Sequence, residues 1–174
     1  MRQLGKHCPQ LETLRLRSIV VEDEISAQNP EDDSKEVTTL PRLRVCAIGR
    51  QEDRTYNQSL AQSTIVRLLR AMPSIEEFSI GSGASSIDAA KPHVQNTFQT
   101  PTPSLRTLRL EGFSLSNSSF SGVVPDQIES IILKSCCDHA HSVLEAFQTS
   151  SNIVNSSIID DGDEVRLTVK QGYM

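Results

Sequence analysis

One eight-residue phrase returns five times along this chain of 174 residues. It begins at Pro9 (PQLETLRL), Pro41 (PRLRVCAI), Pro73 (PSIEEFSI), Pro103 (PSLRTLRL) and Asp126 (DQIESIIL). If the first residue is counted as zero, positions +2, +5 and +7 are apolar in every copy. A segment that recurs in this way folds as one unit per copy, and neighbouring units stack to bury a shared core. The repeat therefore restricts the chain to folds built from stacked copies.

The apolar spacing predicts one short β-strand in each copy. Side chains two residues apart point to the same face of a strand, so +5 and +7 face inward while +4, +6 and +8 face outward. The proline at position zero suits a corner before the strand, because it fixes φ and donates no ladder hydrogen bond. Stacked copies therefore predict a parallel sheet whose inner face packs against the returning segments.

Three returning segments are predicted to be helical: residues 2–8, 63–72 and 138–148. The last two begin at residues that can cap a helix, Ser63 or Thr64 in one and Asp138 in the other. Both carry apolar residues at helical spacing. The side chains expected to face the core are Ile65, Leu68, Leu69 and Met72, and Ala140, Val143, Leu144 and Phe147.

The C-terminal residues 149–174 are predicted to form a hairpin that caps the repeats of residues 1–148. Asp161 and Gly162 lie between two strand-like runs, a pair that favours a type I′ turn. The side chains expected to face the core are Val165, Leu167 and Val169. Residues 22–36 and 81–104 show little apolar periodicity and are predicted to be loops.

The repeated phrases resemble the leucine-rich repeat, whose core reads LxxLxLxx(N/C)xL. The fourth copy supplies Phe113 and Leu115 at the last two positions, and the fifth places Cys136 at the (N/C) position. The phrases CPQLETLRL and PSLRTLRL are similar to the irregular repeats of fungal F-box/leucine-rich-repeat proteins, over residues 1–137. This resemblance implies an α/β, ribonuclease-inhibitor-like solenoid. It has a parallel β-sheet on its concave face and irregular helices and loops on the other.

The outward strand positions are the predicted protein-binding surface. Its residues are Arg15, Arg17, Glu77, Arg109, Glu111 and Lys134. Basic residues lie at both ends with small and apolar ones between, and the planar guanidinium of arginine binds carboxylates through two hydrogen bonds. Eleven of the 22 acidic residues fall in 22–36 and 160–164, which we expect to lie off the sheet, so the surface is expected to be locally basic. The alternative is that these are ordinary solvated strand positions.

Composition excludes several classes of protein. With 17 Lys+Arg against 22 Asp+Glu, the net charge is −5, which argues against a nucleic-acid binder. The sequence contains no apolar run of the ~18 residues that a membrane span needs. The first ten residues contain no apolar signal region, so the four cysteines are expected to be free thiols in a cytoplasmic or nuclear protein.

No motif in the sequence predicts catalysis, a cofactor or a metal. Cys136, Cys137, His139 and His141 are zinc-type ligands, but adjacent cysteines do not easily point at one ion. The GSGASS stretch lacks the spacing of a phosphate-binding loop, and DDGDE is too short for an EF-hand calcium loop. A nucleophile elbow is also missing from the sequence. We therefore predict that the chain is not an enzyme.

The family resemblance implies a role in substrate recognition for an F-box-type ubiquitin ligase. An F-box normally precedes the repeats, and only eight residues precede Pro9 here. Contact with the ligase adaptor is therefore expected only if an F-box lies upstream, and the chain is then expected to be a fragment. The alternative is a stand-alone scaffold or inhibitor of the ribonuclease-inhibitor type. A metal-dependent enzyme that uses residues 136–141 is a third hypothesis.

Overall fold

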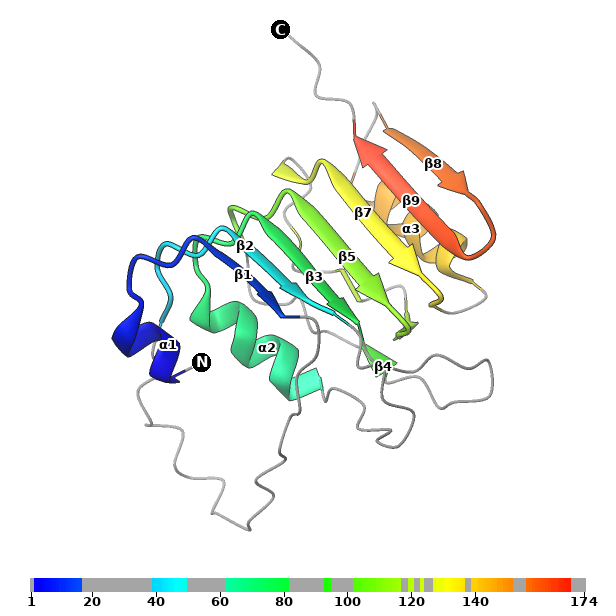
Figure 1. The fold of residues 1–174 in the computed structure, drawn as a ribbon. Helices are drawn as coiled ribbons and strands as arrows, with labels where there is room; N and C mark the ends of the chain where they lie inside the picture. Colours follow the sequence, from blue (N-terminus) through cyan, green and yellow to red (C-terminus); the bar gives the residue numbers. More distant parts are fainter. Residues whose placement is uncertain are drawn as a thin grey trace, which may run out of the picture.

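The computed structural model describes residues 2–16, 39–49, 62–81, 93–94, 102–116, 119–120, 123, 127–136, 139–151 and 156–169. This part of the chain is α/β, and a mostly parallel seven-stranded sheet dominates it (Figure 1). The parallel strands are, in spatial order, β1 (Thr13–Leu16), β2 (Val45–Ile48), β3 (Glu77–Gly81), β5 (Thr107–Glu111) and β7 (Ser130–Lys134). The antiparallel strands β9 (Glu164–Val169) and β8 (Ser156–Asp160) continue the sheet beyond β7.

The five parallel strands are the five strands that the repeat predicts. Their register aligns equal positions of successive copies, so that Leu14, Cys46, Phe78, Leu108 and Ile131 form one row across the inner face. From the second copy onward the +2, +5 and +7 side chains are almost fully buried, as in Leu43, Cys46 and Ile48 of β2. The predicted parallel strands are confirmed, as are their inward positions from the second copy onward.

A turn with the same hydrogen bond precedes four of the strands. In each, the N–H of position +2 donates to the carbonyl of the residue before the proline, from Leu11 to Cys8 at 3.1 Å in the first copy and from Leu105 to Thr102 at 3.1 Å in the fourth. This bond spans four residues and places the proline second, where its fixed φ suits a β-turn. The predicted corner is therefore a β-turn.

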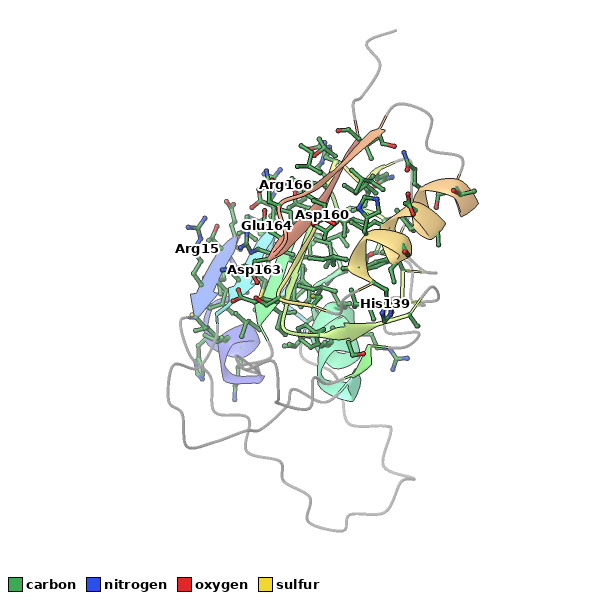
Figure 2. The ribbon with its side chains drawn as sticks, turned by 90° about the vertical axis from the view of Figure 1, so that its right-hand side faces the viewer. Arg15, His139, Asp160, Asp163, Glu164 and Arg166 are labelled. Atoms are coloured by element: carbon green, nitrogen blue, oxygen red, sulfur yellow. The ribbon has the colours of Figure 1, made fainter. Side chains whose placement is uncertain are left out.

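Helices α1 (Arg2–His7), α2 (Gln62–Ala71) and α3 (Ala140–Ser150) overlap the three predicted helical segments. The predicted cap at Ser63 or Thr64 is wrong, because α2 begins at Gln62 and both residues lie inside the helix. Figure 2 shows α2 and α3 on the same side of the sheet, where their apolar side chains join the core. Position His139 caps α3 without a side-chain hydrogen bond. The predicted Asp138 cap is therefore wrong, because the N-cap position of α3 is His139, one residue later. Asp138 itself lies outside the described residues. None of the described helices is long and apolar enough to span a bilayer.

The predicted C-terminal hairpin is present as β8 and β9, but its turn is not type I′. A type I′ turn needs positive φ at both central residues. Among the described non-glycine residues only Ser135 has a positive φ, whereas Gly162 has φ 81°. The Asp163 N–H donates to the Asp161 carbonyl at 3.1 Å, which closes a γ-turn centred on Gly162. Val165 and Leu167 are buried and Val169 packs against the core, as predicted.

Of the two segments predicted to be loops, the structure tests only the second. Residues 22–36 lie outside the described part of the chain. Within 81–104 the structure places a two-residue strand, β4 (His93–Val94), which pairs in parallel with β6 (Ser114–Leu115) in a second small sheet. The prediction of loop throughout 81–104 is therefore wrong at β4, because a two-residue strand is too short for apolar periodicity to reveal.

A row of alternating charges borders the parallel sheet, and the sequence reasoning missed it. Position +3 of the five copies holds Glu12, Arg44, Glu76, Arg106 and Glu129, which we call the charge ladder. The Arg44 guanidinium donates to both carboxylate oxygens of Glu76 at 2.8 and 2.9 Å, and Arg106 donates to Glu129 at 2.7 Å. Opposite charges in adjacent copies therefore favour the observed stacking.

Candidate functional site: the outer face of the sheet

The side of the sheet away from α2 and α3 is the candidate binding face, which we call the outer face. In Figure 2, Arg15, Glu164 and Arg166 lie on this side, whereas His139 lies on the side of α3. The strand register aligns the middle positions of all seven strands into one row. In spatial order the row is Arg15, Ala47, Ser79, Arg109, Ile132, Arg166 and Ile159. Side chains from segments distant in sequence thus form one continuous surface.

Ion pairs connect the charged residues at the β5–β7–β9 end of the outer face. Glu164 accepts from Arg166 at 2.7 Å, and its second oxygen lies 3.4 Å from Nη2 of Arg109. Lys134 lies 3.9 Å from Glu111 on the neighbouring strand. Three predicted site residues are therefore brought together, and each has a partner of opposite charge.

The expectation that residues 160–164 lie off the sheet is wrong for Asp160 and Glu164, whereas residues 161–163 form the turn between the strands. Asp160 ends β8, and Glu164 begins β9 directly opposite Lys134. The reason is that β9 pairs with β7, the last parallel strand, so the hairpin extends the same face instead of standing apart from it. This end of the outer face is consequently mixed in charge and not basic.

The β1–β3 end of the outer face holds two isolated charges. Arg15 on β1 and Glu77 on β3 are exposed, and neither forms an ion pair with any described residue. The short side chains of Ala47 and Ser79 separate Arg15 from Arg109. The sixth predicted site residue, Arg17, lies outside the described residues. Among the described residues, this end therefore presents a cation and a carboxylate without ion-pair partners, with short side chains between Arg15 and Arg109.

Sequence reasoning missed three residues of the outer face: Ile159, Glu164 and Arg166. Ile159 is 51% exposed on the edge strand β8. The signal that would have revealed Glu164 and Arg166 is the alternation within residues 164–169, whose inward members Val165 and Leu167 imply that these two face outward. What the alternation leaves open is which strand the hairpin joins.

The zinc-type residues of 136–141 point to different partners. Cys136 is buried and its thiol donates to the Leu110 carbonyl at 3.5 Å. His139 contacts the Leu115 carbonyl at 3.1 Å, while His141 lies 3.4 Å from Glu145 with one ring nitrogen and 3.4 Å from Asp160 with the other. Cys137 lies outside the described residues, among which no three such side chains converge on a metal position.

Comparison with known proteins identifies no relative for the chain. A scan against protein-family models and searches of curated proteins and of solved structures found no match. Function is therefore inferred from the outer face and from the sequence resemblance.

Proposed function

We propose that this chain is a leucine-rich-repeat solenoid that binds a protein partner through its outer face, without catalysis. The observation that carries the proposal is the row Arg15–Ala47–Ser79–Arg109, in which two arginines flank two short side chains across four parallel strands. With strands ~4.8 Å apart, the two arginines stand about 14 Å apart. This spacing suits a segment that carries two acidic groups and lies across the strands.

The available charges indicate how such a partner is oriented. Arg15 forms no ion pair with a described residue, whereas Arg109 shares Glu164 with Arg166. An acidic group of the partner over Arg15 therefore gains a new ion pair, and one over Arg109 must compete with Glu164. Charged residues of this kind direct specificity and the rate of association more than raw affinity.

A charge-reversed variant tests this surface. The full chain with Arg15→Glu and Arg109→Glu is expected to lose the protein partners that the wild type captures in affinity purification, while its circular dichroism is unchanged. A second variant, Ala47→Arg, fills the space between the arginines without touching an ion pair and is expected to lose the same partners. Arg42→Glu with Arg70→Glu, which reverses two exposed arginines outside the strands, serves as the matched control. Partners retained by both surface variants would refute the proposal.

The narrower proposal is substrate recognition for an F-box-type ubiquitin ligase, which rests on the resemblance of the repeats. A stand-alone scaffold or inhibitor is the alternative. Affinity purification of the natural gene product distinguishes the ligase role from the scaffold role. The ligase role requires that a ligase adaptor co-purifies with it. Partners recovered without an adaptor would favour the scaffold.

A further inference from the structure

The two edges of the seven-stranded sheet are finished differently. Beyond β7 the hairpin continues the ladder, and the Val169 N–H donates to the Glu129 carbonyl at 2.9 Å. At the opposite edge, β1 has no neighbouring strand in the described part of the chain (Figure 1). An open edge presents a row of unpaired backbone groups that another strand can join.

The core of the first copy is incompletely covered. Leu11 and Leu14 are partly exposed, whereas Leu43 and Cys46, which hold the same positions in the second copy, are 0% and 1% exposed. Leu16 is likewise less buried than its counterpart Ile48. In each later copy these side chains are covered by the preceding copy. At β1 the same side chains remain partly exposed.

At this edge the described residues do not supply one specific backbone acceptor. At all four steps between copies, one carbonyl at position +3 accepts from the +3 and +4 N–H groups of the next copy, as the Glu12 carbonyl accepts from Arg44 and Val45 at 2.9 and 3.1 Å. The equivalent donors of the first copy are the Glu12 and Thr13 N–H groups, and no described residue accepts from either. A strand that joins β1 in the same register supplies the missing carbonyl.

The charge ladder specifies the side chain next to that carbonyl. Charges alternate in sign along the ladder, and Glu12 is its last member at the open edge. The guanidinium of Arg44, its neighbour, is already bound to Glu76 through two hydrogen bonds. Continued alternation therefore calls for a basic residue on the outer side of Glu12.

We propose that the open edge of β1 docks a parallel strand from a protein partner. The strand has a basic residue beside Glu12 and apolar residues two and four positions later, beside Leu14 and Leu16. Strand addition of this kind gains affinity from main-chain hydrogen bonds and specificity from alternate side chains. The site is separate from the outer face, because it uses the edge of β1 and the inner side of the sheet.

The chain itself offers a matched pair of probes. A capped peptide of residues 103–111 (PSLRTLRLE) carries Arg106 at position +3, and the same peptide with Arg106→Glu differs only in that charge. Isotope-labelled full chain is titrated with each peptide, and backbone amide shifts and hydrogen exchange are followed by NMR. The arginine peptide is expected to bind saturably, to protect the amides of Glu12 and Thr13, and to bind about three to ten times more tightly than its glutamate variant.

Variants of the full chain locate the contact. Glu12→Gln is expected to remove the preference for arginine, and Glu12→Arg to reverse it. Ala47→Arg, which obstructs the outer face, is expected to leave peptide binding unchanged, so that the two sites are tested separately. The proposal is overturned if neither peptide binds saturably, if the shifts fall on β8, or if the preference is the same with and without Glu12. It is also overturned if sedimentation shows that the free chain self-associates with its β1 amides already protected.

Discussion

Cys46 lies at position +5 of β2, between Leu14 and Phe78 on the neighbouring strands, and is 1% exposed. Burial raises the pKa of its thiol from an ordinary 9.0 to about 11. The unfolded chain therefore releases this proton at a lower pH than the folded chain does. The stabilising contribution is complete below about pH 9 and is lost as the pH rises to about 11, a decrease of roughly 2–3 kcal/mol.

Urea unfolding under reducing conditions at pH 8 and at pH 11 measures this contribution. Cys46→Val keeps an apolar side chain of similar size and has no thiol, so its free energy of unfolding should fall less over this interval than that of the wild type. Cys8→Ser removes an exposed thiol and should follow the wild type. Parallel pH profiles for the wild type and Cys46→Val would contradict the assignment.

At the scale of single residues, the sequence predicts burial well and pairing poorly. Positions +2, +5 and +7 were identified because burial follows from periodicity along one strand. The ion pair between Arg109 and Glu164 joins residues on strands that the repeat does not relate. Its prediction requires knowledge of which strand β9 joins, and no local pattern contains that information.

Among the secondary-structure elements, the hairpin depends on a contact made by the end of β7. Ser135 follows that strand with φ 47°, a left-handed conformation unusual for a residue other than glycine. Its N–H donates to the Asp163 carbonyl at 2.7 Å and its hydroxyl to the Asp163 carboxylate at 2.6 Å. The two hydrogen bonds attach the β8–β9 turn to the parallel part of the sheet.

Substitutions at Ser135 separate the backbone cost from the side-chain hydrogen bond. Ser135→Ala keeps the left-handed backbone and loses the hydrogen bond, so the free energy of unfolding should fall by about 1 kcal/mol. Ser135→Gly loses the same bond but relieves a conformational cost of about 1–2 kcal/mol, so it should be close to neutral. Urea denaturation measures both, and faster hydrogen exchange in β8 and β9 should accompany the alanine variant.

Ser157→Ala is the control for the hairpin, since Ser157 is exposed on β8 and its hydroxyl makes no hydrogen bond to a described residue. Equal losses for alanine and glycine at position 135 would show that the backbone conformation carries no cost.

The contact between Ser135 and Asp163 also bears on the turn type, which the sequence mispredicted. Asp161 and Gly162 favour type I′ locally, whereas the attachment of Asp163 to Ser135 accompanies a γ-turn.

Over the whole molecule, the five-fold repeat predicts the parallel sheet because each copy can bury its inner face only against the next. It does not predict the order in which copies stack, since all five present similar apolar patterns. The charge ladder restricts the order to arrangements in which the signs alternate. If one copy were skipped, Glu12 would lie beside Glu76 or Arg44 beside Arg106, and like charges directly opposite each other are destabilising. In the observed order every neighbour has opposite charge, a property that it shares with the other orders in which the three glutamates and two arginines alternate.

Reversing one member of the ladder tests its contribution. Arg106→Glu removes the 2.7 Å contact with Glu129 and places three acidic side chains in succession with Glu76. Because both partners are about half exposed, the expected loss of unfolding free energy is modest, about 1 kcal/mol in low salt, and most of it should disappear in 1 M NaCl. Arg42→Glu makes the same change at an exposed position with no ion pair to a described residue, so it should alter stability less and with little dependence on salt. An equal, salt-insensitive loss in both variants would mean that the ladder does not act through charge and leaves the stacking order to apolar packing alone.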